Sequence, residues 1–117
     1  MPARRLTGSA WAGFFVGGAL FGVLATACTL QYRAFGYTDF DLAVHVQSTW
    51  NLLHGSLDCS ILGMPWPGNH ANWILVLIAP VFALAPSPLT LLLIQSVALA
   101  LGAWPVWLLA RREFESD

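Results

Sequence analysis

Charge is what this sequence lacks most. Asp, Glu, Lys and Arg make up 9% of its 117 residues, and lysine is absent. A soluble domain averages about 25% charged residues, because charge keeps its surface hydrated. The shortage excludes an ordinary water-soluble domain, and with 57% hydrophobic residues it also excludes a disordered chain. A formal net charge of −1 leaves no basic surface for nucleic acid, so a lipid bilayer is the solvent that fits.

Motifs for several kinds of chemistry are also missing. The sequence contains no glycine-rich phosphate loop, no nucleophile motif and no internal repeat. Its two cysteines, Cys28 and Cys59, are not spaced as zinc ligands are. They suit the role of small apolar residues better than that of a disulfide, although an oxidising compartment would allow one.

Long uncharged runs are what the sequence has instead. No charged residue occurs within residues 6–32 or 59–110. A helix that crosses a bilayer needs about 20 apolar residues, and two close prolines end a helix. The first run therefore holds one span, and the second, broken by the prolines of residues 85–88, holds two. We expect an all-α integral membrane protein with about three membrane helices, at residues 9–31, 72–86 and 89–110.

The span at residues 72–86 is the weakest of the three. At about 1.5 Å per residue it reaches only about 20 Å, and Pro80 would kink it. A short helix inside a larger bundle and a re-entrant helix both remain open for this segment.

The arginines give part of the orientation. Arg4 and Arg5 precede the first span within the polar end at residues 1–8, and positive charge is retained on the cytoplasmic side. We therefore expect a multi-pass protein of the plasma membrane with the loop at residues 32–71 outside. Three spans would place the arginines of the polar tail at residues 111–117 outside as well, against the same rule, so the side of the C-terminus stays open.

The N-terminus also resembles a cleavable signal peptide. Arg4 and Arg5 are followed by an apolar stretch and by residues 25–28, which could serve as a lipidation site at Cys28. The stretch is longer than the 7–15 residues of a typical signal core, and further apolar runs follow. An uncleaved anchor is therefore the preferred interpretation.

Small residues recur at a spacing of four along the first span. They form the sets Ser9, Gly13, Gly17 and Gly18, Gly22. Small residues at this spacing let helices approach closely. Packing within the chain is the preferred interpretation, with a homodimer as the alternative. Gln95 in the third span likewise favours a helix covered by protein, because an amide in lipid needs a partner.

The outer loop contains a predicted surface helix at residues 40–54. Apolar residues recur there at helical spacing, at Leu42, Val46, Trp50 and Leu53. Thr38 and Asp41 resemble a capping box, and Gly55 suits the position after a helix end. The segment is too short and too polar to cross a bilayer, so we expect an amphipathic helix on the outer membrane surface.

The candidate catalytic and ligand-binding residues lie in this loop. Asp41 and His45, with Ser48 beyond them, fall on one face of the expected helix and could hold a proton or a metal. The alternative is that Asp39 and Asp41 only cap the helix. His70, just before the second span, could add a further group or could be an ordinary interfacial side chain.

Several short segments, in one order, resemble a known family. They are residues 40–42, Gln47, residues 50–53 with Gly55, His70, residues 79–84, residues 88–95 and residues 110–112. Together they cover about residues 35–112. The chain resembles a bacterial and archaeal family of predicted polytopic membrane proteins, a domain of unknown function placed in the GT-C glycosyltransferase superfamily.

The resemblance implies an enzyme that takes a sugar from a polyprenyl-phosphate carrier. In such enzymes an acidic residue near the start of the outer surface helix acts as a base toward the acceptor or binds a divalent metal. Asp41 matches this acid best, with Asp39 as the second choice. His70 matches a histidine of the family pattern, and with His45 and Gln47 it forms the expected substrate-binding set. No metal ligand is assigned.

Members of this family are several hundred residues long. We therefore expect this chain to be an N-terminal fragment that is inactive alone and whose helices contact the bilayer and further membrane helices. The alternative is an autonomous small membrane protein that packs against a membrane partner and modulates it.

Overall fold

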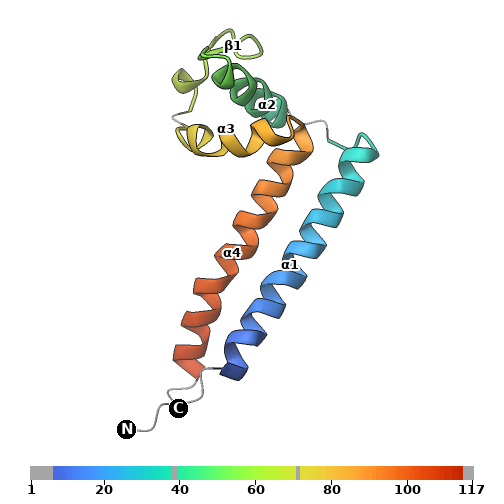
Figure 1. Ribbon diagram of the computed structural model, residues 1–117, viewed down its shortest axis with the longest axis vertical. Helices are drawn as coiled ribbons and strands as arrows, with labels where there is room; N and C mark the ends of the chain where they lie inside the picture. Colours follow the sequence, from blue (N-terminus) through green and yellow to red (C-terminus); the bar gives the residue numbers. More distant parts are fainter. Residues whose placement is uncertain (1–6, 38–39, 71, 115–117) are drawn as a thin grey trace.

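The computed structural model describes residues 7–37, 40–70 and 72–114. Two long helices, α1 (Thr7–Arg33) and α4 (Pro88–Phe114), carry a small head at one end (Figure 1). The head contains α2 (Phe40–Leu53), β1 (Asp58–Cys59), β2 (Met64–Pro65), the 3-10 turn Trp66–Gly68 and α3 (Ile74–Leu84). The molecule extends 61 × 31 × 25 Å, so it is an elongated hairpin with a cap.

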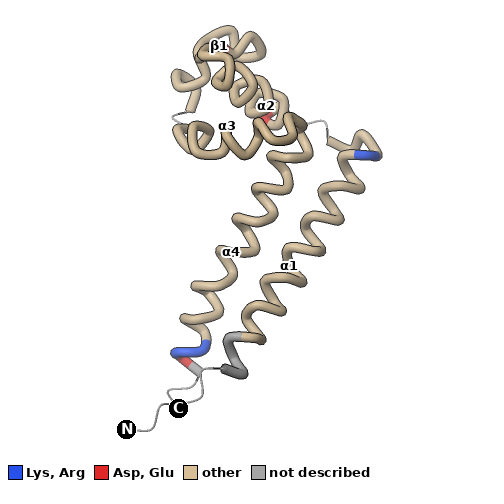
Figure 2. The backbone as a smooth tube through the Cα atoms, viewed as in Figure 1, with Lys and Arg blue, Asp and Glu red and all other residues tan. Residues whose placement is uncertain are grey.

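Helices α1 and α4 are antiparallel, so α1 begins at the end of the molecule where α4 finishes (Figure 1). Each has 27 residues, which at about 1.5 Å per residue gives about 40 Å. Both are long and apolar enough to cross a membrane by length and composition. Figure 2 shows charged residues at the head end of α1 and in the last turn of α4, and none along the middle of either helix. The spans expected at residues 9–31 and 89–110 lie inside these helices.

The third expected span has a different form. Helix α3 has 11 residues, about 16 Å of helix, which is half of the roughly 30 Å of hydrocarbon. It lies across the head end of α4 and not alongside it (Figure 1). Two helices of the described residues are candidate spans, so the count of three is not confirmed.

Helices α1 and α4 pack so closely at Gly13 that no side chain fits there. A Cβ atom at Gly13 would lie 2.6 Å from Trp104 Cζ3 and 2.9 Å from Trp107 Nε1. One turn further along, a Cβ at Gly17 would lie 3.8 Å from the Ala100 carbonyl oxygen. The small residues at positions 13 and 17 therefore serve packing within the chain, as preferred from the sequence.

The head has its own small core. Four residues from different elements are buried together there: Val44 of α2, Cys59 of β1, Trp66 of the 3-10 turn and Leu75 of α3. The strands pair antiparallel, with Asp58 opposite Pro65. Neither strand was expected from the sequence, because a two-residue strand shows no periodicity.

The ends of the helices follow local rules. Helix α2 ends one residue before the predicted boundary, and Gly55 adopts φ +75°, the left-handed conformation that glycine favours. Helix α4 begins at Pro88, where a missing N–H costs nothing, and the Leu89 N–H donates to Ser87 Oγ at 3.2 Å. The helix predicted at residues 40–54 is thus present as α2, while its placement on a membrane surface stays a prediction.

Candidate functional site

A groove of about 750 Å³ lies between the head and the neighbouring parts of α1 and α4. Most of its lining is apolar and comes from all four helices, as with Leu24, Leu42, Ile78 and Leu91. The polar side chains in the lining are Cys28, Tyr37, Asp41, His45, Gln95 and Ser96. The groove therefore combines mostly apolar walls with a few polar groups, as small-molecule sites do.

Asp41 brings the only acidic side chain among the described residues that line this groove. It lies in the first turn of α2, where a negative charge is favoured by the helix dipole. Its side chain is exposed, and within the described residues no hydrogen bond to its carboxylate occurs. A carboxylate in this state can accept a proton or a hydrogen bond from a ligand.

His45 lies one turn from Asp41 but does not pair with its carboxylate. His45 Nδ1 lies 2.6 Å from the Asp41 main-chain carbonyl oxygen, which can only accept, so Nδ1 donates. Asn72 Nδ2 then donates to His45 Nε2 at 3.2 Å. The ring thus connects the first turn of α2 with the residue two positions before α3.

The other expected site residues lie elsewhere. His70 is exposed and is not part of the groove lining. Gln47 contacts the loop between β1 and β2. Its Nε2 donates to Ser60 Oγ at 2.6 Å, and its Oε1 accepts from the Ile61 N–H at 3.2 Å. Asp39 lies outside the described residues. The structure thus brings Asp41 and His45 to one groove, and places His70 and Gln47 away from it.

Three further polar residues belong to the site although the sequence did not single them out for it. Ser96 is buried and its Oγ lies 3.8 Å from Cys28 Sγ, which joins α4 to α1 at the groove. Asn72 fixes the His45 ring. These contacts link residues 68 and 27 positions apart, and no local pattern signals such a distance. Both cysteines are free.

Ser48, which continues the Asp41–His45 face in the sequence, does not reach the groove. It is buried in the head, and its Oγ has no hydrogen-bond partner among the described residues. Nor do the described residues gather three His, Cys, Asp or Glu side chains that could hold a metal ion.

The comparison with protein families decides what kind of protein carries this groove. A family model described as "Predicted membrane protein (DUF2079)" matches residues 31–117. The chain belongs to this family. No curated protein matches the chain, and no solved structure does.

The DUF2079 match includes the whole head and α4, and begins within the last turn of α1. It therefore contains Asp41, His45 and Asn72, together with the α4 side of the groove. Family membership agrees with the two long apolar helices and identifies the chain as a membrane protein.

Proposed function

We propose that this chain forms the base-bearing part of a GT-C-like glycosyltransferase that uses a polyprenyl-phosphate sugar. The observation that carries the proposal is the exposed Asp41 carboxylate in the lining of a largely apolar groove. In this arrangement a lipid carrier lies along the apolar walls while its headgroup meets the carboxylate.

The walls of the groove suit a prenyl chain. They combine Leu24 of α1 with Leu91 and Leu99 of α4, which are parts of the two candidate spans. An isoprenoid offers no hydrogen-bonding groups, so apolar walls bind it through van der Waals contacts and leave no polar group of the wall unsatisfied. The groove volume of about 750 Å³ lies within the usual range for ligand pockets.

Asp41 acts in this proposal as the general base that accepts the proton of the acceptor hydroxyl. A base must lie within hydrogen-bond reach of that proton, and an exposed carboxylate can do so. His45 is a substrate-binding residue in this proposal. Its ring also holds the first turn of α2 through the Asp41 main-chain carbonyl. His70 remains a substrate-binding candidate from the exposed loop. Gln47 supports the site by holding the hairpin against α2.

A divalent metal is a further role that the resemblance implies for the acid. Among the described residues, Asp41 is the one carboxylate on the groove and no trio of ligands surrounds it. The residues described do not form a metal site, so no step of the proposed reaction uses one.

The groove needs further helices to close. Most side chains of both candidate spans face outward from the chain, and Gln95 is exposed on the groove. An exposed amide at this depth needs a protein partner. We therefore propose that additional membrane helices complete the site and that this chain alone does not transfer sugar.

Photocrosslinking tests the lipid assignment on the purified chain. We expect a diazirine-bearing polyprenyl phosphate, added to the chain in nanodiscs, to label residues 91–99, and unlabelled polyprenyl phosphate to compete. Leu99→Trp fills the groove and should lower the competed labelling several-fold. Leu101→Trp is the matched control, because Leu101 lies outside this groove.

Two results would contradict the proposal. Labelling that polyprenyl phosphate does not compete, or that Leu99→Trp leaves unchanged, would remove the lipid carrier from the groove. Sugar transfer by the purified chain, lost in Asp41→Asn, would show that no further helices are needed.

One observation supports the alternative of a small membrane protein that modulates a partner. A Cβ added at Gly18 or Gly22 would meet no atom within 4 Å, so these two glycines are not used by packing within the chain. If a partner helix docks there, Gly18→Leu should abolish a defined complex in detergent and leave the hairpin folded.

A further inference from the structure

We propose that α3 lies in the interface of the lipid leaflet next to the head, with its face opposite α2 inserted among the acyl chains. This membrane-binding surface is independent of the proposed function, because it requires neither a sugar nor a prenyl carrier. It rests on the two faces of α3, on the direction of the exposed face and on the position of the bilayer.

The two faces of α3 differ sharply in burial. Leu75, Ala79 and Phe82, spaced by four and three residues, are 2%, 4% and 1% exposed. Leu77 and Leu84 lie on the opposite side of the helix and are 71% and 85% exposed. A helix of 11 residues that leaves large aliphatic side chains uncovered along one face needs an apolar environment on that side.

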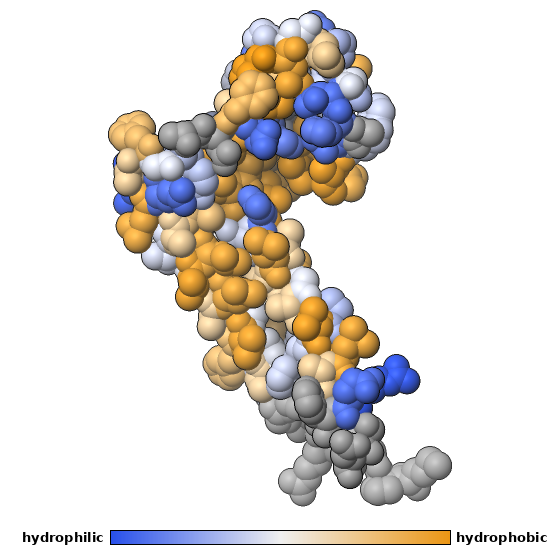
Figure 3. Space-filling view, turned by 180° about the vertical axis from the view of Figure 1, so that it is seen from behind, coloured by the Kyte–Doolittle hydropathy of each residue, from blue (hydrophilic) through white to orange (hydrophobic). Residues whose placement is uncertain are grey.

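The exposed face points along the spans. Helix α3 packs chiefly on α2. Helix α2 and the β1–β2 hairpin lie on the side of α3 away from α1 and α4 (Figure 1). The opposite face of α3 therefore points toward the end of α1 and α4 that lies away from the head. Figure 3 shows hydrophobic surface on this underside of the head, continuous with the surface of the spans.

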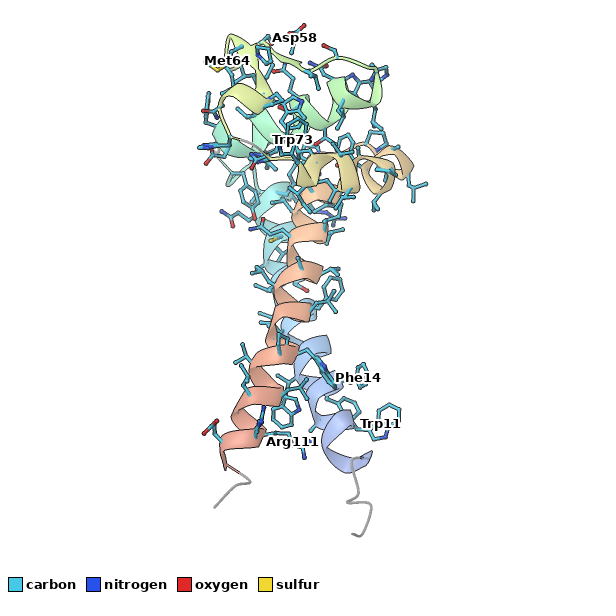
Figure 4. All side chains as sticks on the ribbon, turned by 90° about the vertical axis from the view of Figure 1, so that its left-hand side faces the viewer. Trp11, Phe14, Asp58, Met64, Trp73 and Arg111 are labelled. Atoms are coloured by element: carbon cyan, nitrogen blue, oxygen red, sulfur yellow. The ribbon has the colours of Figure 1, made fainter. Side chains whose placement is uncertain are left out.

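Aromatic residues locate the bilayer relative to α3. Trp11 and Tyr32 lie near the two ends of α1, about 32 Å of helix apart at about 1.5 Å per residue. This matches the roughly 30 Å of hydrocarbon, at whose boundaries Trp and Tyr are enriched. Figure 4 shows Trp11 at the far end, and Trp73 between the spans and the outer residues Asp58 and Met64.

Trp73 precedes α3 directly and is 59% exposed. Its ring packs edge-on against Trp66 at 5.6 Å between centroids, which anchors it to the head core. An exposed tryptophan at the start of an apolar helix suits the headgroup level. The lipid face of α3 is thus continuous with that of the spans and flanked by an interfacial residue, which favours lipid over a protein partner.

Depth-dependent quenching tests the proposal. In a Cys28→Ala, Cys59→Ser background, single cysteines at Leu77, Asn69 and Val23 are labelled with the fluorophore NBD. The proteins are reconstituted in phosphatidylcholine–phosphatidylglycerol vesicles that carry nitroxide lipids labelled at carbon 5 or carbon 12. Val23, near the middle of α1 and exposed, is the deep control, and Asn69, exposed in the head, is the aqueous control.

We expect the label at Leu77 to be quenched at least twice as strongly by the carbon-5 lipid as by the carbon-12 lipid. The Val23 label should show the reverse order, and the Asn69 label should be quenched by neither. A Leu77 profile equal to that of Val23 would overturn the proposal in favour of a span.

Quenching at Leu77 as weak as at Asn69 would also overturn it. Reaction with a water-soluble maleimide then indicates a face in water, and protection from it indicates a face covered by protein. Leu84→Cys repeats the measurement on the same face, so a misfolded Leu77 variant does not leave the result open. None of these outcomes depends on prenyl binding, so this proposal and the proposed function can fail separately.

Discussion

The approach of the two long helices depends on one missing side chain. At Gly13 a Cβ atom would come within 2.6 Å of the Trp104 ring and 2.9 Å of the Trp107 ring. The two tryptophan rings occupy the space that a side chain at position 13 would need. Phe14 adds a tilted contact with the Trp104 ring at 5.1 Å between centroids. Small residues serve this purpose in membrane helices because the bilayer provides no hydrophobic force between helices.

We predict that Gly13→Ala destabilises the chain by about 1–3 kcal/mol, the usual cost of overpacking. Gly18→Ala is the matched control, because nothing lies within 4 Å of its added Cβ, and its effect should be neutral or slightly stabilising. Unfolding of the purified chain by dodecyl sulfate in mild detergent measures both. Equal stability of the two variants would show that the seam does not depend on Gly13.

Gln47 shows how a residue with a predicted binding role can be occupied by the fold. Its amide makes three contacts with the hairpin, with Ser60 Oγ, the Ile61 N–H and the Cys59 thiol, which donates to Oε1 at 3.1 Å. Cys59 is 1% exposed, so this last group has no water to replace its partner. Removing the amide leaves a buried donor unpaired.

We predict that Gln47→Ala lowers the free energy of unfolding by about 1–3 kcal/mol, the cost of unsatisfied buried groups. Ser60→Ala removes one exposed contact of the same amide and should cost less than about 1 kcal/mol. Thermal unfolding followed by circular dichroism compares the two variants. If Gln47→Ala proves as stable as Ser60→Ala, the amide is free for a ligand.

At the scale of elements, the sequence predicts best what is decided locally. Helix α2 matches its predicted range because both the 3.6-residue periodicity and the Gly55 stop are local signals. Asp41 and His45 were placed together for the same reason. The hairpin and the Asn72–His45 bond were missed, since they depend on contacts between distant segments. The direction of α3 depends on its packing against α2, and an apolar run contains no information about that direction.

The two faces of α3 give an element-scale prediction. Leu75→Ala removes a side chain that is 2% exposed from the core of the head, and should cost about 2–5 kcal/mol. Leu77→Ala makes the same chemical change at a residue 71% exposed and should cost less than about 1 kcal/mol in detergent. Hydrogen exchange of the α3 amides after each substitution checks this, with protection lost only in Leu75→Ala. Loss of protection in both variants would show that α3 has no buried face.

At the scale of the whole molecule, the arginines bear on the number of spans. Three spans would place the C-terminal arginines outside the cell, against the positive-inside rule. Arg111 and Arg112 in the last turn of α4 lie at the end of the molecule where α1 begins (Figure 2), so they share a side of the membrane with that end of α1 when the two candidate spans, α1 and α4, are the crossings. In the sequence, Arg4 and Arg5 come shortly before α1, so the positive-inside rule counts them together with Arg111 and Arg112. Arg33 alone lies at the head end. The bias agrees with retention of positive charge in the cytoplasm.

We predict that both ends of the chain lie in the cytoplasm and that the head lies outside. Green fluorescent protein fused after residue 117 should then fluoresce, and alkaline phosphatase fused there should be inactive. Phosphatase inserted at Asn69, exposed in the head, should be active. A third crossing by residues 72–86 would reverse the result for the C-terminal fusions and leave the Asn69 insertion unchanged. The pair of positions therefore separates a two-span hairpin from a three-span bundle, because only the crossing by α3 changes the side of α4's last turn.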